Sequence, residues 1–472
     1  MTAATDRAVQ KIDAHRAQKA ADFDLALAHC TDTDIANAQR LVRQFGADMR
    51  YTPERGWLAW DGRRWATDEK SLTIARFAKE TALAIFDEMK FATNRDELFR
   101  HAKRSQSRVS LENMVHVARS EAGIPMRLTD FDSDPWLLNV ANGTIDLRTG
   151  MLREHSRDDA VTKLAPVEYQ VDAECERFDR FIDEITGHDA DLYGYVWRMI
   201  GYSLTGLTTE QTLHFLFGTG ANGKSVLCEV LLNLLGDYAI AASPDLIMAR
   251  RHAGIPNDVA RLRGVRLAVM NETSQGGRFD ESKLKDLTGG DTLSARFLHQ
   301  EFFDFSPTHK LVIRGNHKPA VNGTDEGIWR RLRLVPFTVE IPPERRDLHL
   351  LDKLREELPG ILRWAVAGCI EWQHNGLAPP PVIADAVRLY REESDTLGRF
   401  IGEACEVRKL AEVKSSALFR RYQEFCEQSG ERWISAKDLP AEMERRGFAY
   451  KRTETGRRYL GIELRNADWG PK

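Results

Sequence analysis

Hydrophobic and polar residues are spaced differently in successive parts of the chain, and each spacing predicts a different kind of element. The segment from Thr31 to Gly46 has capping residues, an apolar stripe with helical spacing and a glycine stop. Residues 51 to 65 alternate as a hairpin around the turn Asp61-Gly62. Residues 70 to 125 return to helical spacing and are rich in Lys and Arg.

The aromatic and basic residues of this first part have two interpretations. Trp57, Trp60 and Trp65 could stack on nucleic-acid bases beside Arg63 and Arg64. Tryptophans at such positions are more often core residues, and we favour that interpretation. The basic helices are weak support for contact with a polyanion, because charged helix faces are usually only solvated.

Short strands and two helices lead from this part to the centre of the chain. Leu137 to Val140 and Thr144 to Leu147 are predicted to pair with each other. Residues 177 to 187 and 190 to 206 have helical spacing. The next apolar run, Leu213 to Phe217, has the length of a buried strand.

The residues directly after this strand have the pattern of a phosphate-binding loop. They read GTGANGKS and match G-x-x-x-x-G-K-[ST], and a helix is predicted from Val226 to Leu235. In such a loop backbone N–H groups surround the phosphates at a helix N-terminus, Lys224 reaches the outer phosphates, and the Ser225 hydroxyl holds Mg²⁺. The pattern therefore predicts a nucleoside triphosphate site at Gly218, Thr219, Gly220, Ala221, Asn222, Gly223, Lys224 and Ser225.

Two later strands have polar residues at their ends. Val265 to Met270 is apolar and is followed by Asn271 and Glu272. A carboxylate at the tip of a strand beside a phosphate loop suits the Mg²⁺ shell and the attacking water, so Glu272 is the candidate base. The alternative is an ordinary surface glutamate. Leu311 to Gly315 is another predicted strand, and Asn316 follows it.

The segments around these strands add a hairpin and an arginine pair. Residues 284 to 305 predict a helix and then a hairpin, because apolar and polar residues alternate after the helix. Residues 325 to 337 place Arg330 and Arg331 directly before a further strand. An arginine pair alone is usually a surface feature, so its weight depends on its position after the other elements.

Composition narrows the class of protein without naming a function. The chain has 472 residues, 42% of them hydrophobic, which suits about two to four globular domains. Its net charge of −4 gives no global reason to expect nucleic acid, so any such contact must be local. The six cysteines include no C-x-x-C pair, which suits a reducing cytoplasm. The N-terminus is charged, so we expect no signal peptide. The chain has no long apolar run, so we expect no membrane contact.

The last part of the chain is helical and then becomes basic. Leu351 to Gln373 and Val382 to Cys405 have helical spacing on either side of a proline-rich turn. Beyond Val407, two helical stretches precede two short strands, which suggests a winged helix. Residues 445 to 465 contain seven Arg or Lys and two Glu, a local charge of +5. We expect DNA contacts, with a protein-docking or merely solubilising tail as the alternative, at Arg445, Arg446, Lys451, Arg452, Arg457 and Arg458.

Taken in order, these motifs resemble those of the superfamily 3 helicases. The motifs are GTGANGKS, the strand ending at Glu272, LKDLTGGDTLSARFLHQ, KLVIRGN with Asn316, and GIWRRLRLVPF. They look most like the helicase part of phage and plasmid primase-helicases of the satellite-phage type, which are related to the poxvirus primase-helicase. The resemblance covers roughly residues 130 to 400. It implies an α/β fold with an AAA+-like P-loop ATPase core, usually in a hexameric ring that moves 3′ to 5′ on single-stranded DNA.

The resemblance also implies roles for individual residues. Lys224 and Ser225 would serve ATP and Mg²⁺, Glu272 would be the acidic strand-end residue, and Asn316 would orient water against the γ-phosphate. Either of two arginines would act as an arginine finger in the neighbouring subunit's site, namely Arg330 or Arg331. The hairpin would be the DNA-gripping loop of the ring's pore, with contacts at Lys283, Lys285, Arg296 and His299.

Two departures from the family pattern change what we expect. Many relatives have paired acidic residues at the second strand, whereas Asn271 precedes Glu272 here, so whether Glu272 is a base or a metal ligand stays open. Relatives often have a primase domain ahead of the helicase, but this chain has little room for one and no clear pair of strand-borne acidic residues followed by a His. We therefore expect no priming activity from this chain.

These observations together predict an ATP-dependent DNA helicase of a phage, plasmid or other mobile element in a bacterial host. It would act on single-stranded or forked DNA as a homo-hexamer, with a separate primase or polymerase as a candidate partner. The alternatives are a DNA-stimulated translocase that does not unwind and an ATP-switched replication initiator. The expected division of the chain is an arm (1–30), an accessory domain (31–173), the ATPase (174–345), a helical lid (346–406) and a winged-helix-like domain (407–472).

Overall fold

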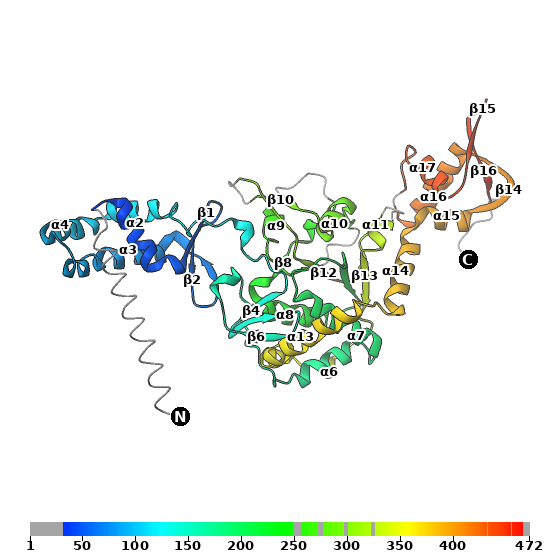
Figure 1. Ribbon diagram of the computed structural model, residues 1–472. Helices are drawn as coiled ribbons and strands as arrows, with labels where there is room; N and C mark the ends of the chain where they lie inside the picture. The colour runs from blue at the N-terminus through cyan, green and yellow to red at the C-terminus, as the bar shows by residue number, and fades with distance from the viewer. Residues whose placement is uncertain are drawn as a thin grey trace.

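The computed structural model of the protein describes residues 32–249, 257–271, 277–296, 301–321, 326–431, 433–454 and 456–465. An N-terminal unit, a central α/β unit and a C-terminal unit follow one another along the molecule, each with its own hydrophobic core (Figure 1).

The N-terminal unit packs helices against a small antiparallel sheet. Helix α2 (Asp34–Phe45) begins at Thr33, whose hydroxyl accepts the N–H of Ala36 at 3.2 Å, and it ends at Gly46 as predicted. Trp57 and Trp65 are 2% and 1% exposed, so their interpretation as core residues is confirmed. The other elements of this unit are β1 (Met49–Thr52), β2 (Gly56–Trp60), β3 (Trp65–Thr67), α3 (Leu72–Ala84), α4 (Arg95–Ser105) and α5 (Arg108–Ala118).

A second small sheet and two helices join the core of the central unit. Strand β4 (Leu137–Val140) pairs with β5 (Gly143–Asp146) as predicted, and β5 pairs with β6 (Met151–Arg153). Helices α6 (Glu176–Ile185) and α7 (Ala190–Ser203) follow. Their apolar residues lie in the same buried cluster as the helix after the phosphate-binding loop. The chain from β4 to α7 therefore belongs to the central core, whereas the sequence placed residues up to 173 in an accessory domain.

The central unit is built on five parallel strands in the order β13-β7-β12-β9-β8. In chain order these are the fifth, first, fourth, third and second strands of the sheet. Parallel strands end at the same edge of a sheet, so the carboxyl ends of β7, β12 and β9 lie together, where α/β sheets bind their ligands. The bounds are β7 (Leu213–Phe217), β8 (Ala239–Ala242), β9 (Leu267–Asn271), β12 (Lys310–Gly315) and β13 (Leu332–Pro336).

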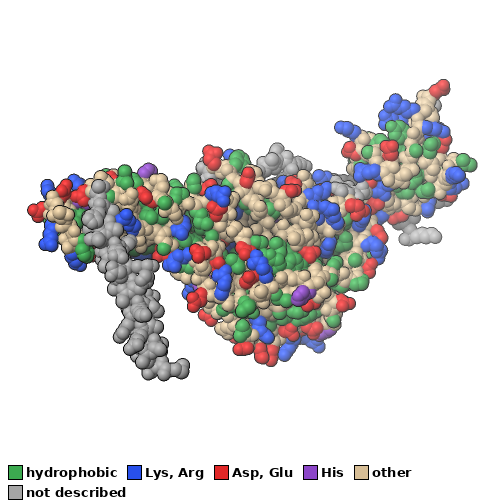
Figure 2. All heavy atoms as spheres, viewed as in Figure 1, with side chains coloured by type: hydrophobic (Ala, Val, Ile, Leu, Met, Phe, Trp, Pro, Cys, Tyr) green, Lys and Arg blue, Asp and Glu red, His purple; other side chains and the backbone are tan. Residues whose placement is uncertain are grey.

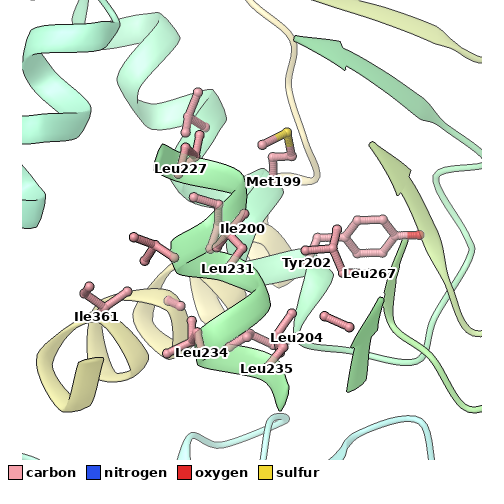
Figure 3. Close-up of a cluster of buried hydrophobic side chains, with 14 of the residues drawn as sticks. Met199, Ile200, Tyr202, Leu204, Leu227, Leu231, Leu234, Leu235, Leu267 and Ile361 are labelled. Carbon is pink, nitrogen blue, oxygen red and sulfur yellow. The ribbon is translucent and has the colours of Figure 1, made fainter. Parts of the chain in front are cut away.

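Helix α8 (Lys224–Leu235) is buried on several sides, which holds its N-terminus at the edge of the sheet. Figure 3 shows Leu231 and Leu234 of α8 between Ile200 of α7 and Ile361 of α13 (Leu358–Asn375). All four side chains are at most 3% exposed. Each buried side chain of this kind contributes about 1.5–3 kcal/mol, so the packing fixes the helix firmly.

Two buried cations tie α7 and β4 to the amino ends of the strands. The Arg266 guanidinium donates to the carbonyls of Leu204 and Leu137. The Lys310 ammonium donates to carbonyls at residues 205 and 207, the latter at 3.3 Å. Carbonyls just after a helix carry partial negative charge, so the C-terminal end of α7 compensates both cations. Burial still lowers the pKa of both side chains.

The C-terminal unit contains the predicted helices and hairpin. The two long helices predicted before it are wrong, because each is broken into two shorter helices. The first breaks between α12 (Leu350–Glu356) and α13. The second breaks at Asp395, whose carboxylate accepts the N–H of Gly398 at 2.9 Å and so caps a new helix. That helix, α15, packs in the core of the C-terminal unit. The elements are α14 (Pro381–Ser394), α15 (Thr396–Ala404), β14 (Cys405–Lys414), α16 (Ser415–Ser429), α17 (Leu439–Arg445), β15 (Tyr450–Thr453) and β16 (Gly456–Leu464).

The three C-terminal strands form an antiparallel sheet in the order β14-β16-β15. Two helices, α16 and α17, precede the β15–β16 hairpin, as predicted. The assignment of this unit as a winged helix stays a prediction. Within the described ranges, none of the helices combines the length and the apolar character that crossing a membrane requires.

Candidate nucleotide-binding site

The predicted phosphate-binding loop, residues 218–225, which we call the phosphate loop, connects the carboxyl end of β7 to the first turn of α8. Gly218 leaves no room for a side chain, because a Cβ there would lie 2.1 Å from the carbonyl oxygen of Phe337. Gly223 has a φ of +81°, and a Cβ there would lie 2.5 Å from Ile185. A Cβ on Gly220 would meet nothing within 4 Å. The loop is thus pinned at both ends and open in the middle, which suits a triphosphate chain.

A buried asparagine holds the loop in shape. Asn222 is 3% exposed, and its amide donates to the carbonyls of Thr219 at 3.2 Å and Phe337 at 2.9 Å. The carbonyl of Ala221 accepts the N–H of Ile341 at 3.0 Å. The sequence pattern allows any residue at position 222, so this anchoring role could not be read from the motif.

Lys224 lies at the centre of the site and touches a predicted partner. Its side chain is 6% exposed. Its ammonium group donates to the Gly218 carbonyl at 2.7 Å, to Asn222 Oδ1 at 2.8 Å and to Asn316 Oδ1 at 3.4 Å. Asn316 directly follows β12, which pairs with β7 in parallel. The strand order therefore brings together the lysine and the asparagine that the sequence assigned to one site.

Of the residues predicted to hold Mg²⁺, the structure describes only Ser225. Ser225 is exposed in the first turn of α8, where its hydroxyl oxygen is a ligand of the type that Mg²⁺ prefers. Asn271 is the last residue of β9 and is also exposed. Glu272, the predicted base, follows Asn271 in the sequence and lies outside the described residues.

Arg314 is a residue of this site that sequence analysis missed. It lies on β12, two residues before Asn316, and its Nε donates to Asn271 Oδ1 at 2.5 Å. Its Nη1 donates to the Ser225 carbonyl at 3.2 Å, and its Nη2 lies 3.6 Å from the Glu229 carboxylate. One guanidinium therefore joins the end of β9 to the start of α8. The available signal was a charged residue directly after the apolar run Leu311 to Ile313.

The two arginines of the predicted finger have different environments. Arg330 is exposed, directly after α11 (Glu326–Trp329). Arg331 is 7% exposed and donates to the Gly327 carbonyl at 2.7 Å. The Arg331 carbonyl accepts the N–H of Leu213, the first residue of β7, at 2.8 Å. Both arginines thus lie at the amino edge of the sheet, about 13 Å of strand away from the phosphate loop of their own chain.

The predicted hairpin of the central unit is confirmed, although its tip is not described. β10 (Leu293–Ala295) pairs with β11 (Phe303–Phe305). The Arg296 guanidinium lies 4.9 Å from the centre of the Phe302 ring. His299 lies outside the described residues. On α10 (Glu281–Thr288), the side chains of Lys283 and Lys285 are partly exposed, and that of Lys283 lies 3.4 Å from Asp280.

The basic residues of the C-terminal unit are concentrated on the β15–β16 hairpin. Lys451 lies opposite Arg458, and Arg452 lies opposite Arg457. Like charges directly opposite each other in a sheet destabilise it unless a counter-charge lies nearby. Glu412 of β14 supplies one to Lys451 and, at 3.6 Å, to Arg458. Figure 2 shows Lys and Arg side chains gathered beside this hairpin.

The two arginines before this hairpin differ in how strongly they are held. Arg446 forms a bidentate ion pair with the Asp395 carboxylate, at 2.6 and 2.9 Å, and its side chain is 19% exposed. Arg445 is 62% exposed and lies 2.8 Å from Glu442. Arg446 therefore stabilises the unit, whereas Arg445 remains accessible.

Two family models match the chain. One is described as D5 N terminal like and matches residues 38–187, and the other is a family of unknown function (DUF5906) and matches residues 216–331. The first ends two residues after α6, and the second runs from β7 to Arg331.

Viral proteins are among the relatives of the chain. A protein of Acanthamoeba polyphaga mimivirus named as a candidate helicase is 24% identical over 387 residues, with 74% of this chain and 40% of the relative covered. A protein of African swine fever virus named as a candidate primase is 26% identical over 337 residues, with 65% of this chain and 35% of the relative covered. The chain thus spans less than half the length of these relatives.

Among solved structures, the apo structure of the NrS-1 C-terminal region (305-718) overlays with a TM-score of 0.42 at 10% identity. The overlay covers 76% of this chain and 90% of that one. The two structures are therefore only distantly alike.

Proposed function

Because this chain is related to the D5-like primase-helicases, we propose that it is an ATP-driven DNA helicase that acts in replication of a mobile element. The observation that carries the proposal is the contact of Lys224, in the phosphate loop, with Asn316, at the end of the neighbouring strand. A bare phosphate loop is compatible with kinases, transporters and motors alike. A polar residue beside the lysine at the next strand end is what a site needs to orient water against a γ-phosphate.

In the proposed reaction the residues of the site bind ATP, hold the metal ion and activate water. The backbone N–H groups of the phosphate loop and Lys224 bind the phosphates of ATP, and Asn316 orients the attacking water. Glu272 accepts the proton of that water or supports the metal shell, both of which its place after β9 permits. Mg²⁺, held by Ser225 and Glu272, would neutralise charge that develops on the phosphate oxygens.

The site is completed by a second subunit in this proposal. Arg330 lies at the amino edge of the sheet, and the phosphate loop lies at the carboxyl edge, so Arg330 serves the loop of a neighbouring chain. An arginine finger of this kind accelerates phosphoryl transfer by about 10³ to 10⁵. Hydrolysis therefore requires assembly, for which we propose an AAA+-like hexameric ring that moves 3′ to 5′.

DNA is contacted at two places in this proposal. The β10–β11 hairpin, with Arg296 at its described end, grips single-stranded DNA in the pore. The C-terminal unit, as a winged helix, binds the phosphates of forked DNA through Arg452 and Arg457, which are exposed and lie opposite each other on the hairpin. A separate primase or polymerase would extend the exposed strand.

The proposal is tested by measuring ATP hydrolysis with and without single-stranded DNA, together with strand displacement on forked substrates. Lys224→Ala should abolish both activities, whereas the control Lys409→Ala, at an exposed position on β14, should keep both. Hydrolysis stimulated by DNA without displacement of forks of either polarity would favour a translocase. Origin binding with negligible hydrolysis would favour an ATP-switched initiator and would contradict the helicase proposal.

A further inference from the structure

Three cationic side chains lie within electrostatic range of one another where the N-terminal unit joins the central unit. Arg55 lies in the turn between β1 and β2, Lys163 lies in the segment after β6, and Arg263 lies four residues before β9. All three are half-buried. We call these three residues the junction cluster.

Contacts with a nearby glycine and carbonyl define the geometry of the cluster. A Cβ on Gly264 would lie 2.7 Å from Lys163 Cε and 3.8 Å from an oxygen of Asp132. The Arg263 guanidinium donates to the Leu128 carbonyl at 2.5 Å. Lys163 and Asp132 thus lie beside Gly264, and the Arg263 guanidinium bonds to the segment just before Asp132.

The carboxylate of Asp132, which lies beside the cluster, has other partners. Asp132 accepts the N–H of Thr162 at 2.7 Å and the hydroxyl of Thr162 at 2.5 Å. Among the residues that the structure describes, none of the three cations has an ion pair within 4.0 Å. Asp132 therefore compensates the cations only at longer range.

Positive charge is in excess at this point. Burial lowers the pKa of all three side chains, for Arg263 to about 10, and repulsion from Arg55 lowers the pKa of the other two further. The other nearby carboxylates are Glu54, which is exposed, and Asp237, which is paired with Arg64. The cluster is unlike the deeper cations Arg266 and Lys310, which donate to carbonyls just after α7 and, for Arg266, on β4.

We propose that the junction cluster is a second phosphate-binding site, which takes a phosphate group of a nucleic-acid backbone or of a free nucleotide. Arginine and lysine side chains that converge without a bonded carboxylate are the chemistry that phosphate oxygens require. The site is separate from the phosphate loop, because Arg263 precedes the amino end of β9 and the loop follows the carboxyl end of β7. A phosphate bound there connects Arg55 of the N-terminal unit to Arg263 of the central unit.

The test uses the full chain with Lys224→Ala, Arg296→Ala, Arg452→Ala and Arg457→Ala, so that neither the phosphate loop nor the proposed DNA contacts contribute. Thermal unfolding is followed with sodium pyrophosphate, with a short oligo-dT strand, and with sodium chloride at matched ionic strength. We expect pyrophosphate or oligo-dT to raise the melting temperature beyond sodium chloride. Adding Lys163→Gln or Arg263→Gln should raise the half-saturating concentration about tenfold or more, as expected from the loss of a charge-assisted hydrogen bond.

Matched variants separate binding from a structural role. Arg261→Gln removes an exposed arginine of the same segment and should leave the shift unchanged. Lys163→Arg keeps the positive charge and should therefore keep the ligand-induced rise in melting temperature. Without ligand, Lys163→Gln should melt at or above the temperature of its parent, because it relieves repulsion.

The outcomes are distinct. A shift with oligo-dT at lower phosphate concentration than with pyrophosphate assigns the site to a nucleic-acid backbone, and a shift with pyrophosphate alone assigns it to a free nucleotide or phosphate. A shift that survives Lys163→Gln and Arg263→Gln overturns the proposal, as does no shift beyond sodium chloride. Destabilisation of ligand-free Lys163→Gln would likewise overturn it, because the lysine would then be structural. None of these results depends on ATP hydrolysis or unwinding.

Discussion

The side-chain oxygen of Asn316 accepts a hydrogen bond from the Lys224 ammonium at 3.4 Å, although the two residues are 92 positions apart. Parallel pairing of β12 with β7 makes the contact, because it places the residue after β12 beside the loop after β7. The lysine proposed to bind phosphate and the residue proposed to orient water are therefore positioned by one sheet.

Asn316→Ala should slow ATP hydrolysis with little effect on ATP binding. A group that positions the attacking water acts on the chemical step, so we expect kcat to fall about 10²-fold or more. Fluorescent-nucleotide binding and steady-state hydrolysis check this, with Asn375→Ala, at an exposed position on the end of α13, as the control. Parallel losses in binding and kcat would instead give Asn316 a role in holding the phosphates.

Arg314→Ala should also lower kcat more than it raises KM. Its guanidinium holds Asn271 and the Ser225 carbonyl in one arrangement, and the loss of this link leaves the end of β9 free to move. Arg314→Lys keeps the charge but lacks the planar fork, so it should recover only part of the activity. Full recovery by lysine would show that only the charge matters there.

Arg330 and Arg331 should separate into a catalytic and a structural residue. Arg331→Ala removes a buried side chain bonded to Gly327 and should lower stability by about 1–3 kcal/mol. Arg330→Ala should leave the melting temperature unchanged and abolish DNA-stimulated hydrolysis. Mixing Arg330→Ala subunits with Lys224→Ala subunits should restore part of it. No restoration in the mixture would contradict an arginine that acts across an interface.

The protein should lose stability as the pH falls below about 6.5. Burial lowers the pKa of His214 to about 3 and that of His309 to about 4, from an ordinary value of 6.5. The unfolded chain therefore takes up these protons first, and stability is full above pH 6.5 and decreases toward the folded-state values. Each histidine contributes up to about 1.4 kcal/mol per pH unit. Urea unfolding between neutral pH and about pH 5 measures the slope, and a flat profile would contradict the prediction.

The C-terminal arginines should also separate into residues that bind DNA and a residue that stabilises the fold. Arg452→Ala and Arg457→Ala should each weaken DNA binding and reduce the salt dependence of its logarithm by about one unit. Arg446→Ala should lower the melting temperature instead, because it releases Asp395. An unchanged salt dependence in the first two variants would favour the alternative of a protein-docking or solubilising tail.

Local pattern was sufficient for most elements of this chain and for the phosphate loop. Helical and strand periodicity arise from neighbouring residues, so α2, the β4–β5 hairpin and β7 could be predicted from residues a few positions apart. The break at Asp395 combines a local cap on the N–H of Gly398 with a contact to Arg446, 51 positions later. Only the second of these could not be read from neighbouring residues.

Residues 218 to 225 were enough to predict a nucleotide site, because the glycines, the lysine and the helix start are all contained in one short segment. Strand order had to come from the folded chain, since a linear pattern does not encode which strands become neighbours. That order puts Asn316 beside Lys224, joins β9 to α8 through Arg314, and puts Arg330 at the edge opposite its own loop. The same packing of distant segments brings Arg55, Lys163 and Arg263 together.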